Sequence, residues 1–127
     1  MAMHPNWKLS EDRLVEPLLE REPDNVPGPF YVIKDRCIIC ALPVETAPAN
    51  ITWRMCDGCP DRCRVERQPE SAPELETMIE VVRGSCVDAY RYCGTDGYVL
   101  NKLTELGQAH SCDALVHANP VLRDQIK

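Results

Sequence analysis

The chain has 127 residues, enough for one domain with modest extensions, and it carries 8 cysteines and 11 prolines but only 1 Phe and 2 Trp. Its net charge of −6 is spread along the chain, which argues against nucleic-acid binding, since that function normally needs a basic face. No apolar run reaches membrane-spanning length, and the N-terminus lacks the basic and apolar regions of a secretory signal. We therefore expect a cytoplasmic protein with reduced thiols, in which clustered cysteines indicate metal or redox chemistry.

Residues 1–27 are predicted to form an N-terminal appendage and linker. A short helix is expected to begin at Ser10, and Pro17 limits it to one or two turns. Proline and glycine then interrupt the chain repeatedly between residues 23 and 29, which indicates a linker.

A domain is expected to begin at residue 28 with a strand over residues 30–33, where aromatic and β-branched residues follow one another. Residues 42–46 have room only for a short helix. Residues 50–55 and 63–67 both alternate between apolar and polar side chains, and turn-forming residues separate them. This pattern predicts a β-hairpin.

Two longer helices follow in the prediction. Ser71 and Glu74 have the spacing of a capping box, and apolar residues at helical spacing continue toward Gly84. A second helix is expected from about Thr95 to Gly107. The predicted domain then covers residues 28–112, with 113–127 as a polar C-terminal tail, and its fold class is α+β with little sheet.

The cysteines follow a spacing with two CxxC pairs: Cys37-x2-Cys40-x15-Cys56-x2-Cys59-x3-Cys63-x22-Cys86-x6-Cys93-x18-Cys112. Two sulfurs separated by two residues can turn toward one metal, and thiolates bind both zinc and iron–sulfur clusters. From the spacing alone, Cys37, Cys40, Cys56 and Cys59 match a four-cysteine structural zinc site.

The segment from Tyr31 to Ile51 resembles the cluster-binding segment of bacterial single-cluster ferredoxins. In that family a strand leads into CxxCxxC, then a short acidic helix, Ala-Pro and the next strand. The residues from Ser85 to Tyr90 resemble the family's distal Cys-Pro-x-x-Ala segment. The resemblance implies a ferredoxin-like domain with an extra C-terminal helix and an iron–sulfur cluster, of the 4Fe-4S or 3Fe-4S type, bound through Cys37, Cys40 and Cys86.

The chain is also similar to a divergent group of ferredoxin-like proteins, and this likeness extends to about Cys112. The matching segments are Gly28-Pro29-Phe30-Tyr31-Val32, the run from Cys37 to Pro48, Cys63, Gln68-Pro69-Glu70, Ser85-Cys86, Arg91-Tyr92 and the run from Leu103 to Gly107.

One departure from the family pattern bears on the ligands. Pro43 occupies the third cysteine position of CxxCxxC and has no thiolate. Three interpretations stay open: Cys63 supplies the fourth ligand, a three-iron cluster binds to three cysteines, or the fold persists without a cluster. Cys56 and Cys59 are additions to the pattern, which bind a separate metal with Cys63 or form a redox-active dithiol.

Cys93 and Cys112 are expected to be core or stray thiols and not ligands. The sequence contains no nucleophile elbow, phosphate loop or HExxH motif, so we expect no enzyme. Two functions follow. The first is electron transfer to a redox partner enzyme, with the acidic surface aiding the encounter. The second is a protein-binding module, regulatory or toxin-neutralising, in which zinc or a cluster is structural.

Overall fold

The computed structural model describes residue 4 and residues 6–23, 25–34, 42–54, 62–84 and 89–125. This part of the chain contains both helices and strands, which is compatible with the predicted α+β class. In chain order the elements are η1 (Leu9–Glu11), β1 (Phe30–Val32), α1 (Leu42–Thr46), β2 (Ile51–Arg54), β3 (Arg62–Val65), α2 (Ala72–Gly84), β4 (Tyr90–Tyr92), α3 (Gly97–Glu105), η2 (Ala109–Ser111), α4 (Asp113–Ala118) and η3 (Pro120–Gln125).

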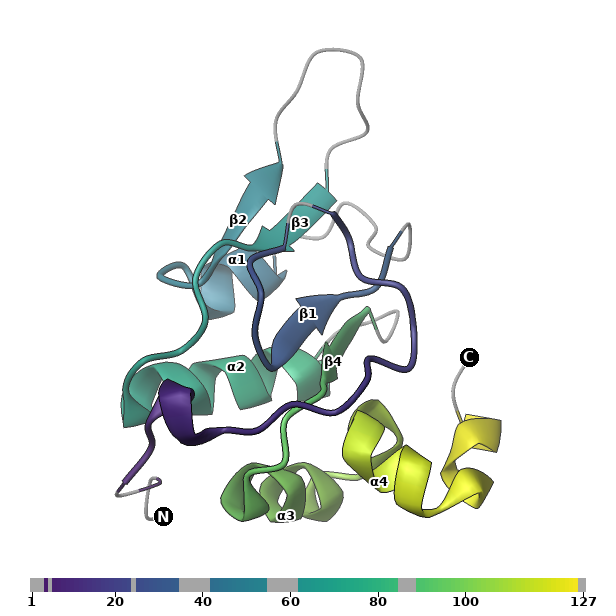
Figure 1. Ribbon diagram of the computed structural model, residues 1–127. Helices are drawn as coiled ribbons and strands as arrows, with labels where there is room; N and C mark the ends of the chain where they lie inside the picture. The colour runs from purple at the N-terminus through teal and green to yellow at the C-terminus, as the bar shows by residue number, and fades with distance from the viewer. Residues whose placement is uncertain are drawn as a thin grey trace.

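The described strands form two small antiparallel sheets (Figure 1). In the first, β1 pairs with β4, and Val32 lies opposite Tyr90. In the second, β2 and β3 form the predicted hairpin, with Ile51 opposite Val65 and Arg54 opposite Arg62. The strand β4 has no counterpart in the sequence prediction.

The strand β1 is buried on both faces, although it is only three residues long. Phe30 and Val32 pack in the main core with Leu75 and Met78 of α2. On the opposite face, the neighbouring Tyr31 forms a second buried cluster with Ile33 and Cys93. Burial on both faces explains why the strand is a continuous apolar run without polar alternation.

Helix α2 confirms the capping-box prediction. Its apolar residues recur three and four positions apart, so they share one face, which is fully buried in the core. At its N-terminus the Ser71 hydroxyl accepts a hydrogen bond from the Glu74 amide at 3.4 Å. Helix α1 also matches its predicted range of 42–46.

The N-terminal segment, residues 6–23, runs along the folded domain, and the helix expected after Ser10 is only the 3-10 turn η1. Beyond this turn the chain is extended: the Val15 amide donates to the Cys93 carbonyl at 2.9 Å, and the Glu22 amide to the Val32 carbonyl at 2.8 Å. In Figure 1 this segment, in purple to dark blue, crosses in front of α2 and passes around β1. Extended backbone completes hydrogen bonds here that a helix would leave unmade.

Gly28 and Gln68 lie together at the start of β1. The buried Gln68 side chain accepts a hydrogen bond from the Phe30 amide at 3.0 Å and donates to the Phe30 carbonyl at 2.8 Å. Gly28 has a φ of +143°, and a Cβ there would lie 2.4 Å from Cγ of Gln68. Glycine at position 28 therefore leaves room for the amide that fixes the first residue of the strand.

The C-terminal part of the chain packs against the β1–β4 sheet. Asp96 caps α3 through the Val99 amide, so the helix expected from about Thr95 begins at Gly97. The described part of the predicted tail contains α4, whose Asp113 and Val116 are buried, and the exposed turn η3. Among the described helices, none is both long and apolar enough to cross a membrane.

Candidate metal centre

The described backbone shows how the segments next to the candidate cysteine ligands are held. Cys37, Cys40, Cys56, Cys59 and Cys86 lie outside the described residues, as does the thiol of Cys63. For these cysteines, the structure thus gives the positions of the chain segments that come before and after them.

The β1–β4 sheet holds the chain before Cys37 beside the chain after Cys86. The Ile33 amide donates to the Ala89 carbonyl at 2.8 Å, which continues the antiparallel pairing by one step. The backbone of the next residue, Lys34, is also held in place, because its amide donates to the Glu20 carbonyl at 2.8 Å. The two cysteine-bearing segments thus join the sheet at the same end.

Helix α1 begins two residues after Cys40 and has Pro43 in its first turn. Proline is well tolerated there, since the first turn of a helix needs no internal donor. The Pro43 carbonyl accepts the Ala47 amide at 3.0 Å, and the proline side chain is buried. The residue at the third cysteine position of the family motif is thus a packed helix residue.

The hairpin fixes the backbone of Cys63 opposite Trp53. Residues 55–61, which contain Cys56 and Cys59, connect Arg54 of β2 to Arg62 of β3 and lie outside the described residues. The register places Cys63 one residue inside the last paired position of the hairpin, two positions from Val65, which is buried in the core.

Cys93 and Cys112 are free and fully buried, which confirms the prediction that they are core thiols. Burial raises the pKa of Cys93 to about 11, and burial raises the pKa of Cys112 to about 12. Both thiols are therefore protonated at neutral pH, whereas a metal ligand must be a thiolate. Within the described ranges, no three His, Cys, Asp or Glu side chains gather as a metal-binding group.

The chain matches no protein-family model, no curated protein and no solved structure. The fold and the side-chain geometry are thus the observations on which its function is argued.

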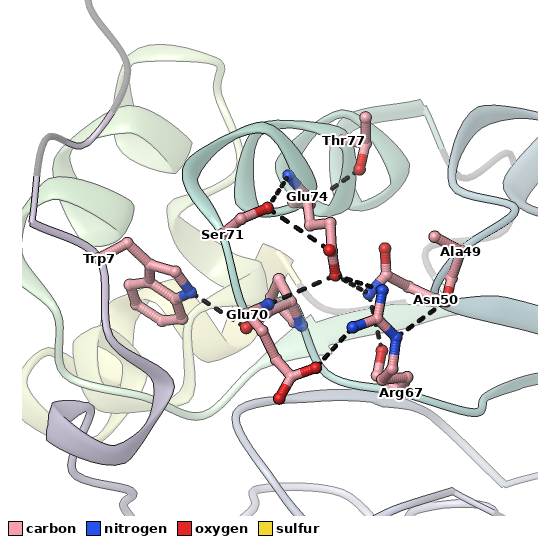
Figure 2. Close-up of polar contacts among 9 residues, drawn as sticks. Trp7, Ala49, Asn50, Arg67, Glu70, Ser71, Glu74 and Thr77 are labelled. Carbon is pink, nitrogen blue, oxygen red and sulfur yellow. Dashed lines mark hydrogen bonds and ion pairs between the residues drawn. The ribbon is translucent and has the colours of Figure 1, made fainter.

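A polar cluster joins the start of α2 to the strands below it (Figure 2). Oε1 of Glu74 lies 2.9 Å from Nη2 of Arg67 and accepts a hydrogen bond from Nδ2 of Asn50 at 3.0 Å. Arg67 also pairs with Glu70 at 2.5 Å. The cluster connects the β2–β3 hairpin to α2, and it places the buried amide of Asn50 next to an exposed charge network.

Glu74 makes the stability of this cluster depend on pH. Burial opposes its ionisation, but hydrogen bonds from Asn50 and Arg67 outweigh that effect and hold the pKa of Glu74 below its ordinary 4.5. When the pKa of a carboxyl group is lower in the folded state than in the unfolded state, its ionised form stabilises the fold at pH values above the unfolded-state pKa. This stabilisation is lost as the pH falls through the folded-state pKa.

We therefore expect Glu74→Gln to lose less stability than the wild-type protein when the pH falls from 6 to below 4. Urea unfolding at a series of pH values measures this slope. Glu80→Gln is the matched control on the same helix, because Glu80 forms an exposed pair with Arg83. Equal slopes for wild type and Glu74→Gln would exclude this role of Glu74.

A second polar cluster, which the sequence analysis missed, is buried between β1, β4 and α4. Oδ1 of Asp113 accepts from Nε of Arg91 at 2.7 Å, and Oδ2 accepts from the Tyr31 hydroxyl at 2.5 Å and the Leu18 amide at 3.1 Å. Arg91 also donates to the His110 carbonyl at 2.7 Å. Burial and the adjacent Asp113 carboxylate raise the pKa of Tyr31, so the phenol remains a donor. An acidic residue at the start of a helix is common, so the sequence around Asp113 does not indicate that its carboxylate is buried against Arg91.

Proposed function

We propose that this chain is a small ferredoxin-like protein that binds an iron–sulfur cluster and transfers electrons to a partner enzyme. Cys37, Cys40 and Cys86 are its proposed ligands, and Cys63 is the proposed fourth. When bound, the cluster would supply reversible one-electron chemistry. The chain would supply the thiolates and a fixed backbone around them.

The pairing of β1 with β4 is the observation that carries this proposal. Lys34 is three residues before Cys37, and Ala89 is three residues after Cys86. Three residues of extended chain span at most about 11 Å, so each cysteine lies within that reach of one end of the same sheet. Cysteines that are 49 positions apart can therefore reach each other, as a shared metal centre requires.

The order of elements adds support. A strand, the CxxC segment, a short helix, a hairpin, a longer helix, a distal cysteine and a returning strand follow one another, and this is the order that the ferredoxin-like resemblance implies up to the distal cysteine. The donor chemistry fits as well, since thiolates are the ligands of iron–sulfur clusters and of structural zinc.

Anaerobic purification followed by an absorption spectrum and a count of iron, acid-labile sulfide and zinc tests the proposal. Broad visible absorption with iron and sulfide, and a reversible redox signal, are the expected results. A colourless protein with stoichiometric zinc would replace the cluster by a structural zinc site. Absence of both metals from protein purified anaerobically and reconstituted with iron and sulfide would contradict the proposal.

Cys37→Ala and Cys40→Ala are expected to lose the visible absorption and most of the bound iron, and also to lower stability, because metal binding is coupled to folding. Cys93→Ala is the matched control, because Cys93 is a buried, protonated thiol within the described fold. It is expected to retain its iron. Wild-type metal content in a folded Cys37→Ala protein would contradict the ligand assignment.

A second candidate function is a non-catalytic binding module on the same scaffold, with a structural metal. Parts of the structure that the ferredoxin-like resemblance does not include favour this function. The N-terminal segment pairs with β1 and with the residues just after β4, and α3 and α4 extend the domain beyond β4. Electron transfer needs none of these additions. A redox-silent protein that binds one partner tightly would favour this function over the first.

A further inference from the structure

A pocket of about 170 Å³ lies between α1 and α2, outside the proposed metal centre. We call it the α1–α2 pocket. The loop from α1 to β2 forms one side, and the first half of α2 forms the other. Its lining is mostly apolar and consists of Thr46, Ala47, Pro48, Ala49, Asn50, Pro73, Glu74 and Thr77.

Asn50 is the polar residue that distinguishes this pocket. The residue is 1% exposed, and its Nδ2 donates to the Arg67 carbonyl at 2.9 Å and to Glu74 at 3.0 Å. These two acceptors fix the amide orientation, since the reversed amide would place its single oxygen against both acceptor oxygens. Among the described residues, Oδ1 then has no hydrogen-bond partner, and in Figure 2 it points away from Arg67.

A buried acceptor without a donor is costly, and a ligand that brings an N–H group would remove that cost. The pocket is smaller than the roughly 300–1,000 Å³ typical of small-molecule sites, so it suits a single apolar side chain. A polypeptide segment supplies both groups, an apolar side chain and a backbone N–H donor.

The charges around the pocket indicate which residues would flank the apolar side chain in a bound polypeptide. Glu74 lines the pocket, Glu70 lies exposed beyond Arg67, and Glu45 is exposed on α1 beside the lining residue Thr46. Among the described residues here, only Arg67 is cationic, and it is already paired with two of these carboxylates. The remaining negative charge favours lysine or arginine on the partner.

We propose that the α1–α2 pocket binds a basic, extended segment of a partner protein, with one aliphatic side chain in the pocket and an N–H donor on Oδ1 of Asn50. The proposal deepens the proposed function, since it rests on the chain acting through a partner, and it holds whether the metal is a cluster or zinc.

Selection of a phage-displayed library of random 12-residue peptides on the full-length protein, as purified with its metal, tests this proposal. Enriched peptides are expected to carry Leu, Ile, Val or Met beside Lys or Arg. The corresponding synthetic peptide should shift the side-chain amide resonance of Asn50. Thr77→Phe and the exposed Ala49→Phe, which both fill the pocket, should weaken its binding at least tenfold.

Thr104→Phe on α3 is the matched control for Thr77→Phe, because each threonine hydroxyl donates to a carbonyl of its own helix. It should bind the peptide as the wild-type protein does. Unchanged binding by folded Ala49→Phe, or no pocket-dependent enrichment, would overturn the proposal. Self-association of the wild-type protein that Ala49→Phe abolishes would assign the pocket to a second copy and also overturn it. The metal content of all three variants should stay at the wild-type value, so failure here is distinct from failure of the metal centre.

Discussion

Replacing Asp113 by alanine is expected to lower the free energy of unfolding by about 3–5 kcal/mol, the usual cost of breaking a buried ion pair. The substitution leaves the Arg91 guanidinium charged and buried, because the Arg91 and Asp113 side chains are only 2% and 0% exposed. It also removes the acceptor of the Tyr31 hydroxyl and of the Leu18 amide. Urea unfolding under reducing conditions measures the loss.

Two comparisons show that the loss comes from the unpaired charge. Glu80→Ala breaks a pair of similar length, 2.6 Å, whose side chains are about half exposed, and it should cost less than about 1 kcal/mol. The double variant Arg91→Met, Asp113→Ala should lose less than the sum of its two single variants, since neither charge is then left alone. Additive losses would mean that the two side chains act independently.

Helices α1, α2 and α3 and the hairpin were predictable because their signals are local, whereas α4 lies in the predicted polar tail. In α2 the capping box and the spacing of Leu75, Met78, Ile79 and Val82 all point to one helix, and the structure has it. Residues 42–46 and the β2–β3 hairpin also confirm their predictions.

The strand β4 and the path of the N-terminal segment depend on contacts far along the chain. Tyr90, Arg91 and Tyr92 alternate over only three residues, which is too short a run to predict a strand, and they form one because β1 lies beside them. Leu14 and Val15 have helical spacing with Leu18, yet they are extended because Gly94 and Cys93 offer them backbone partners. Local propensity cannot include a partner about 80 residues away.

In the candidate site, too, some features could be predicted from the sequence and others could not. The spacing and the resemblance drew attention to the cysteines, and the expectation that Cys93 and Cys112 are core thiols agrees with their burial and raised pKa. The ligand set of Cys37, Cys40, Cys63 and Cys86 stays a prediction. Asn50 and Asp113 were not singled out, because an asparagine after a turn and an aspartate at a helix start have ordinary local explanations.

Replacing Trp7 by alanine is expected to lower the free energy of unfolding by about 3–5 kcal/mol, as large-to-small substitutions of buried aromatic residues do. Trp7 is 7% exposed and belongs to the main core, and its indole N–H donates to the Pro69 carbonyl at 3.0 Å. The substitution therefore creates a cavity and leaves a buried acceptor unpaired.

Leu14→Ala is the matched control for Trp7→Ala, because Leu14 lies in the same N-terminal segment but is 48% exposed. Its cost should stay near 0.5 kcal/mol or below. A large loss for Trp7→Ala with a small loss for Leu14→Ala would show that the segment stabilises the domain through one buried side chain. If both variants unfold like the wild-type protein, the segment contributes no stability, and its contacts with β1 and β4 follow from the folding of the rest of the chain.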